Sequence, residues 1–162
     1  MFEVVKWPDP ILKKVASEVT EFDSGELGEL TQNMTRVMCA KGAIGLAAPQ
    51  IGISKRIFVM LKPGNPGVVP VVFINPKIIG ATGGIQTSIE GCLSFPNVTV
   101  SVSRAKNIIV SYFDIFGKGS LTDLQNLSSI CFQHELDHLD GKTFLDYVSP
   151  FKRTILERKM GL

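Results

Sequence analysis

The clearest chemical signal in the sequence is a pair of histidines four residues apart. His134 and His138 frame the pattern His-Glu-x-x-His, and they are the only 2 histidines in the chain. Residues four apart lie on one face of a helix, about 6 Å from each other, so both imidazoles can bind one metal ion while Glu135 acts as a base. Two unrelated core histidines would show this spacing about 1% of the time. The pattern therefore predicts a metal site.

A third ligand must come from elsewhere, and cysteine is the available type. Cys131 precedes His138 by seven residues, and a rise of ~1.5 Å per residue separates their backbones by ~10 Å. Because that is too far for two side chains on one ion, we expect Cys131 beside the metal. Cys92 is the better candidate, since Gly91 before it permits close backbone approach. Taken alone, Cys92 is more typical of a small core residue.

Length and composition describe the frame that must carry this site. The 162 residues are 44% hydrophobic and 20% charged, which predicts one globular domain over residues 1–162. A net charge of +2 gives no reason to expect direct, sequence-specific nucleic acid binding. No apolar run reaches the ~20 residues of a membrane helix, and no secretory signal is visible. With 3 cysteines, too few for a disulfide scaffold, we expect a cytoplasmic protein without membrane contact.

Helical patterns occur near both ends of the chain. The expected N-caps are Asp9, Ser24, Thr122 or Asp123, and Ser149. The third of these helices carries the histidines, and its apolar residues on nearly all sides predict that it is buried in the centre of the fold. The last helix is rich in lysine and arginine.

The middle of the chain is instead typical of strands, because short runs of Val, Ile and Phe alternate with turn residues. The expected strands are 56–61, 68–79, 98–102 and 107–113, with turns at 63–67 and 114–119. The whole predicts an α+β fold, in which a mixed, mostly antiparallel sheet packs around the central buried helix that carries His134 and His138.

Three segments, in order, resemble the signature motifs of the peptide deformylase family. They are Gly45-Leu46-Ala47-Ala48-Pro49-Gln50, Glu90-Gly91-Cys92-Leu93-Ser94 and Gln133-His134-Glu135-Leu136-Asp137-His138. The resemblance covers essentially the whole chain. The chain departs from the family pattern at Ala43, where the first motif usually opens with glycine, and near Asn126, where a glycine is often found. Both departures concern the backbone and leave the chemical groups unchanged.

The resemblance implies a metal-dependent hydrolase that removes the N-formyl group from the N-terminal methionine of newly synthesised proteins and releases formate. Cys92, His134 and His138 would bind one divalent ion, and the water on that ion would be the nucleophile. Glu135 would serve as general base and then general acid. The implied native metal is iron(II), with nickel, cobalt or zinc as substitutes.

The resemblance also implies how the substrate is held. The Gln50 side-chain amide and the Leu93 backbone N–H would stabilise the oxyanion. Extended backbone at Ile44 and Gly45 would pair with the nascent formyl-methionyl peptide. The apolar pocket for methionine would use Ile44, Leu127, Ile130 and Cys131. The basic C-terminal helix permits contact with the ribosome.

Two other classes of protein fit parts of the sequence. A zinc protease of the His-Glu-x-x-His type needs a later third ligand, for which only Glu157 is available, and it leaves Cys92 and Gln50 unexplained. A metal-binding or peptide-binding protein without turnover would keep the same residues. The sequence also leaves open whether Arg104 and Asp137 pair as structural support or lie separately on the surface.

Overall fold

A single antiparallel sheet with the strand order β1-β2-β3-β4-β5 organises the chain, and the computed structural model describes residues 2–63 and 67–162. The strands are β1 (Gly45–Ala47), β2 (Ile57–Pro63), β3 (Val68–Cys92), β4 (Phe95–Phe113) and β5 (Gly119–Gln125). All neighbouring strands run antiparallel, which corrects the expectation of a mixed sheet. The parallel pairing in the described ranges is an isolated bridge between Ser17 and Lys55. The α+β class is confirmed.

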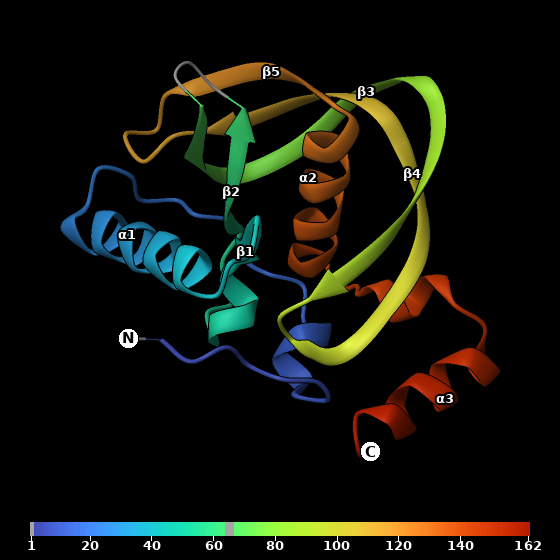
Figure 1. The fold of residues 1–162 in the computed structure, drawn as a ribbon. Helices are drawn as coiled ribbons and strands as arrows, with labels where there is room; N and C mark the ends of the chain where they lie inside the picture. Colours follow the sequence, from blue (N-terminus) through green and yellow to red (C-terminus); the bar gives the residue numbers. More distant parts are fainter. Residues whose placement is uncertain (1, 64–66) are drawn as a thin grey trace.

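Two long, bent strands replace the separate short strands that the sequence predicts. Residues 80–92 continue β3, and β4 joins the two expected strands at 98–102 and 107–113. The pairing of β3 with β4 shifts register at four places, and Gly83 and Gly84 have φ of 75°. Such irregularities let a ladder continue past turn-forming residues while bending it. Figure 1 shows both strands curving around α2, which brings the end of β3 to this helix.

The helix with the histidine pair, α2 (Asn126–Leu139), begins later than the caps expected at Thr122 or Asp123. Those two residues belong to β5, where they pair with Val110 and Ile109 of β4, so their backbone groups lie in the sheet ladder. Asn126 takes the turn from strand to helix with φ of 51°, a conformation that asparagine tolerates. The helix is also not buried on all sides, since Leu127 in its first turn is exposed.

Aromatic packing holds α2 against the sheet. Phe132 of α2 meets Phe58 of β2 and Phe73 of β3 edge to face, with ring centroids 5.1 Å and 5.3 Å apart. All three side chains are fully buried. Because edge-to-face pairs depend on orientation as well as distance, they restrain both the rotation and the position of the helix. His134 and His138, which follow Phe132 on the same helix, are therefore held in a defined direction.

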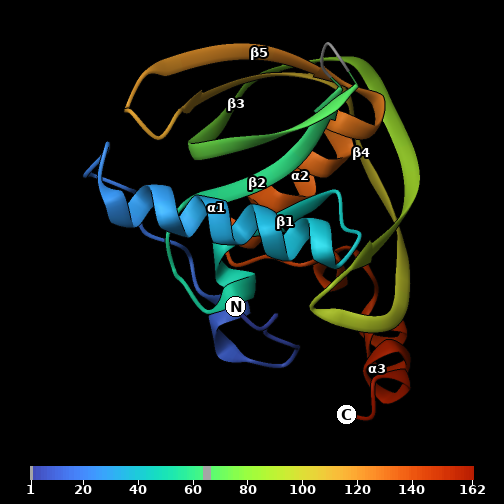
Figure 2. The ribbon, with the colours of Figure 1, turned by 60° about the vertical axis from the view of Figure 1, so that its left-hand side comes forward.

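The remaining helices lie on the outside of the molecule. Ser24 caps α1 (Gly25–Ala40), which packs on β1 and β2 (Figure 2), and Ser149 caps α3 (Pro150–Lys159), as the sequence predicts. The helix expected after Asp9 is a short 3-10 turn, η1 (Pro10–Lys13); the others are η2 (Ala48–Ile51) and η3 (Phe144–Tyr147). The expected turn at 63–67 falls largely on residues 64–66, outside the described ranges. No helix in those ranges has the length and hydropathy needed to cross a membrane.

Candidate metal centre

Three side chains with metal-binding atoms meet where the end of β3 contacts α2. One ligand atom each from Cys92, His134 and His138 lies within 4.8 Å of the others. Sγ of Cys92 is 3.3 Å from Nε2 of His138, and the two imidazole centroids are 5.0 Å apart. A thiolate with two imidazoles suits zinc, iron and related divalent ions, and three protein ligands leave a position for water or substrate. The donor set therefore fits one such ion.

Burial and charge act on the two histidines in opposite directions. Burial lowers the pKa of His138 well below its usual range, and the positive charges of His134 and Arg104 lower it further. Burial also acts to lower the pKa of His134, but the Cys92 thiol and the Glu90 carboxylate beside its ring raise it well above its usual range. His138 is thus held neutral, which is the form of histidine that binds a metal.

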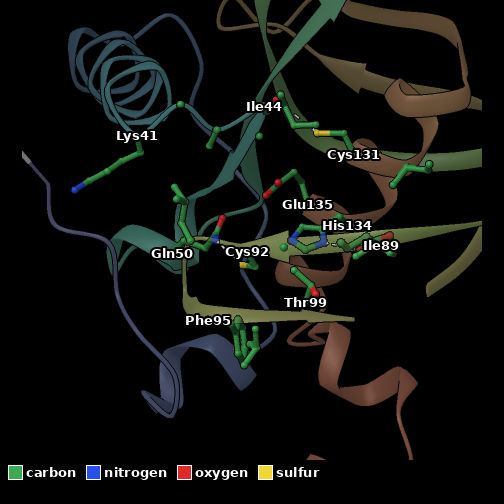
Figure 3. A pocket seen from close by; sticks show the side chains of 18 of the residues that line it. Lys41, Ile44, Gln50, Ile89, Cys92, Phe95, Thr99, Cys131, His134 and Glu135 are labelled. Carbon is green, nitrogen blue, oxygen red and sulfur yellow. Dashed lines mark hydrogen bonds and ion pairs between the residues drawn. The ribbon is translucent and has the colours of Figure 1, made fainter. Parts of the chain in front are cut away.

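Cys131 lies apart from the three ligand side chains, on the other side of Glu135 (Figure 3). Its thiol donates to the carbonyl of Ile44, with Sγ and O 3.6 Å apart. Burial raises the pKa of this thiol, and the negative charges of Glu135 and Glu90 raise it further. Cys131 is therefore held as a neutral thiol in the cavity wall.

Glu90, to which the motif analysis assigned no role, orients the first histidine. Its Oε2 accepts from Nδ1 of His134 at 2.8 Å, which leaves Nε2 of that ring to face Cys92. Two hydrogen bonds from Arg104, Nε to Oε1 at 2.5 Å and Nη2 to Oε2 at 2.9 Å, hold the carboxylate. Burial acts to raise the pKa of Glu90, but its hydrogen bonds with Arg104 and His134 outweigh burial and lower the pKa to about 2.

Arg104 and Asp137 form an ion pair. They therefore do not lie separately on the surface, which was the alternative that the sequence left open. Nη1 of Arg104 donates to Oδ2 of Asp137 at 2.9 Å, and their side chains are only 3% and 15% exposed. The hydroxyl of Tyr147 in η3 donates to the same oxygen at 2.8 Å, and its ring lies under the guanidinium. A continuous polar chain thus connects η3 with His134.

Glu135 is a buried carboxylate with one unpartnered oxygen. Its side chain points from α2 toward Gln50 and Cys92 (Figure 3), and its Oε2 has no hydrogen-bond partner within the described ranges. The other oxygen lies against Gly45, where an added Cβ would clash with it. Burial raises the pKa of Glu135 to about 7, with the charges of His134 and Arg104 acting in the opposite direction. A carboxyl with this pKa can accept and return a proton near neutral pH.

Gln50 lies opposite, in η2 directly after β1. Its Oε1 accepts from the N–H of Ala47 at 2.9 Å, which fixes the orientation of the amide. Its Nε2 then points at Sγ of Cys92 and Oγ of Ser94, each 3.2 Å away. The amide therefore presents a donor beside the candidate metal ligands.

A cavity of about 660 Å³ joins these groups, a size typical of a small-molecule or peptide site. Every residue that the sequence predicted for catalysis or substrate binding lines it: Ile44, Gly45, Gln50, Leu93, Leu127, Ile130, Cys131 and Glu135. Cys92 and His134 also line it, whereas His138 is 1% exposed behind its wall. Glu157 lies elsewhere, bonded to Trp7 and Arg153, and cannot be the third ligand of a protease.

The opposite wall was missed by the sequence reasoning. It consists of Ser88, Ile89, Phe95, Pro96, Asn97, Val98 and Thr99, on both sides of the turn between β3 and β4. These residues form no chemical motif, and their place beside α2 depends on the bends in the two strands. No local signal in the sequence could have found them.

Comparisons with known proteins agree with this geometry. A family model described as polypeptide deformylase matches residues 1–154. A peptide deformylase of Xylella fastidiosa (strain 9a5c) is 40% identical over 162 residues, which cover 99% of this chain and 94% of that protein. Because such identity extends over nearly the full length of both chains, the similarity includes every segment of the candidate site.

Solved structures give the same result. The crystal structure of a peptide deformylase from Legionella pneumophila has a TM-score of 0.92 at 37% identity and covers 99% of this chain and 94% of that one. The Met-Ala-Ser-bound class I type b peptide deformylase from Acinetobacter baumannii has a TM-score of 0.84 at 32% identity, with coverage of 91% and 98%. The chain therefore belongs to the polypeptide deformylase family, metal-dependent enzymes that hydrolyse the N-formyl group from N-terminal methionine.

Proposed function

We propose that this chain releases formate from N-formyl-methionyl peptides at the cavity described above. The observation that carries the proposal is the meeting of three ligand atoms, within 4.8 Å, beside a buried carboxylate with a free oxygen. The proposal treats residues 1–162 as one catalytic domain with α2 as its central helix, because α2 supplies two ligands and the base.

The ligands in this proposal are Cys92, His134 and His138, with iron(II) as the native ion and nickel, cobalt or zinc as substitutes. A divalent ion in this position supplies a water of lowered pKa as nucleophile and polarises the formyl oxygen. The protein's part is to keep the thiol side chain and both imidazoles directed at one point. Arg104 and Glu90 do this for His134 through their paired hydrogen bonds.

Glu135 moves the protons in this proposal. Its carboxylate accepts a proton as the nucleophile attacks the formyl carbon, and later returns it to the amine nitrogen of methionine as the C–N bond breaks. The pKa of about 7 suits both directions of transfer, since neither form of the carboxyl is strongly favoured near neutral pH. The absence of a side chain at Gly45 leaves the space that the carboxylate occupies.

The formyl oxygen gains negative charge as the carbon becomes tetrahedral, and two donors are assigned to it. One is Nε2 of Gln50, whose orientation is supported by the bond from Ala47. The other is the backbone N–H of Leu93, directly after Cys92. Donors held in place before the reaction stabilise such a charge without further rearrangement.

The peptide is proposed to pair with the free edge of β1. Because the carbonyl of Ile44 accepts from Leu61 of β2, the backbone groups of Gly45 point to the opposite edge, where no strand of the described residues follows in the sheet order. A peptide bound there is recognised through its backbone. Its methionine side chain would enter the apolar part of the cavity, formed by Ile44, Leu127, Ile130 and Cys131. The Met-Ala-Ser complex of the Acinetobacter baumannii relative supports a peptide of this kind.

The proposed substrates are nascent chains, so we propose that the protein is located in the cytoplasm, where these chains are made. The ribosome contact is proposed for α3, whose basic residues are Lys152, Arg153, Arg158 and Lys159. Arg153 is already engaged with Glu157 at 3.1 Å, so the other three cations would carry this contact.

The test offers formyl-Met-Ala-Ser, acetyl-Met-Ala-Ser and unblocked Met-Ala-Ser to anaerobically prepared, metal-loaded protein. We expect formate from the first peptide and little acetate from the second, because the proposed site receives only a one-carbon acyl group and the extra methyl group is excluded sterically. Replacing methionine with alanine should lower kcat/KM by about 10- to 200-fold, the range of one hydrophobic pocket. Cleavage of internal peptide bonds without formate would favour a protease, and no turnover with any metal would favour a binding protein.

A further inference from the structure

The N-terminal segment Val5–Trp7 contacts both segments that carry the proposed oxyanion donors. The N–H of Val5 donates to the carbonyl of Gln50 at 2.8 Å, and the N–H of Trp7 donates to the carbonyl of Ser94 at 2.9 Å. Between them, Nζ of Lys6 donates to the carbonyl of Leu93 at 2.5 Å. Three consecutive residues thus connect η2 with the turn that follows β3, and Figure 1 shows the segment passing below both.

This connection bears on the oxyanion donors because they come from segments far apart in sequence. A backbone N–H stabilises an oxyanion only when its peptide plane faces the reacting atom. The hydrogen bond from Lys6 fixes the peptide plane between Leu93 and Ser94, which is joined through the Leu93 Cα to the plane that carries the Leu93 N–H, so it limits the rotation of one plane against the other. A hydrogen bond from an ammonium is charge-assisted and stronger than one between neutral groups.

Lys6 is the side chain through which this restraint acts. It is an exposed residue that lines the cavity, and its described hydrogen bond goes to the Leu93 carbonyl. Within residues 2–63 and 67–162, no carboxylate forms an ion pair with it. The other two hydrogen bonds from the segment to Gln50 and Ser94 are backbone to backbone, so a substitution at Lys6 can remove one of the three and leave the other two in place.

We propose that Lys6 is a positioning residue of the deformylation site, which holds the Leu93 backbone so that its N–H faces the developing oxyanion. This inference rests on the proposed function and adds a residue to it that lies outside all three sequence motifs. Lys6 touches neither the candidate metal nor the formyl group; it acts through Leu93.

The proposal is tested by measuring the kinetics of three variants, Lys6→Met, Lys6→Arg and Lys14→Met. Methionine keeps the length of the side chain and removes the charge and the donor. Lys14 is a matched control, because it is exposed, lies in the same N-terminal region and has no described side-chain contact. Loss of one indirect contact should lower kcat for formyl-Met-Ala-Ser about three- to tenfold in Lys6→Met with KM nearly unchanged. Lys6→Arg should restore kcat to within about twofold, and Lys14→Met should match the unmodified protein.

A binding measurement separates positioning from a general structural effect. A peptide in which an acidic tetrahedral phosphorus group replaces the formyl carbon mimics the transition state, whereas Met-Ala-Ser is the product. If Lys6 acts on the oxyanion, Lys6→Met should lower the affinity for the mimic by the same factor by which it lowers kcat/KM. The affinity for the product should stay unchanged. Titration calorimetry measures both, and metal content and the thermal midpoint are compared in parallel.

Several results would overturn the role of Lys6. A rise in KM with constant kcat would make it a substrate contact, and loss of metal or a lowered thermal midpoint would make it a structural residue. Equal affinity of the mimic for Lys6→Met and the unmodified protein would remove it from the mechanism. If the unmodified protein releases no formate, the proposed function fails, while the affinities for the mimic still decide the role of Lys6.

Discussion

Arg104 holds Glu90 through two parallel hydrogen bonds, and Glu90 in turn accepts from the ring of His134. Arg104 and Glu90 come from the paired strands β4 and β3, and both side chains are at most 5% exposed. A carboxylate behind a metal-binding histidine fixes the ring and its tautomer and strengthens it as a ligand. Metal affinity in this protein should therefore depend on residues that do not touch the metal.

Glu90→Gln should retain the fold and lower metal affinity about 10- to 100-fold, because the amide cannot hold both Arg104 and His134 as the carboxylate does. Competition with a chelator of known affinity measures the change. Tyr147→Phe is the control, since it removes the bond to Asp137 at the far end of the network, with Arg104 and Glu90 between Asp137 and His134. Equal losses in both variants would show that the network supports the fold in general and has no specific effect on His134.

Glu90 should also make the metal-free protein sensitive to acid. Its folded pKa of about 2 lies below the usual value of 4.5, so its stabilisation is complete above pH 4.5 and is lost as the pH falls toward 2. The contribution is about 3 kcal/mol, of which about 2 kcal/mol should disappear between about pH 6 and about pH 3. Urea unfolding measures the free energy of unfolding of the unmodified protein and of Glu90→Gln. The two values should converge as the pH falls over this range. Glu29→Gln, at an exposed position of α1, should show no such convergence.

The two cysteines at the cavity should differ in their effect on metal content. Cys92→Ser, His134→Ala and His138→Ala should each remove most of the metal, because each deletes one of three grouped ligands. Cys131→Ser should bind metal nearly normally, since its thiol is bonded to the Ile44 carbonyl. Mass spectrometric metal analysis of anaerobically purified variants measures this. Equal loss from Cys131→Ser would show that the wrong sulfur was assigned.

Glu135→Gln should keep the metal and the fold but lower turnover by about 10² to 10⁴, because glutamine has the size of glutamate and cannot accept the proton. Formate release and metal content are measured on the same samples. Loss of metal in this variant would instead make Glu135 a ligand.

Gln50→Ala should lower kcat by about 10² to 10³, the usual effect of removing one oxyanion donor, with little change in metal content. Ser94→Ala is the matched control, because it removes the hydroxyl beside the same amide and leaves the amide bonded to Ala47. A turnover number unaffected by Gln50→Ala would exclude this side chain from the mechanism.

Local patterns in the sequence were sufficient for the caps of α1 and α3, for parts of β2, β3 and β4, and for the histidine pair. Ser24 and Ser149 cap their helices through bonds to backbone N–H groups three residues later, so a few neighbouring residues determine the structure. The start of α2 could not be predicted in this way. Thr122 and Asp123 are good caps by themselves, yet pairing with β4 places them in β5, because sheet hydrogen bonds between distant segments override local preference.

The same distinction applies to the site. The spacing of His134 and His138 on one helix was sufficient to predict their shared face, because helix geometry alone sets it. Tertiary structure alone decided that Arg104 holds Glu90, that Asp137 is bonded to Tyr147, and that Lys6 reaches Leu93. These contacts join residues on different elements of the fold. They depend on the bends of β3 and β4 and on the path of the N-terminal segment, which arise from non-local pairing and packing and leave no local pattern in the sequence.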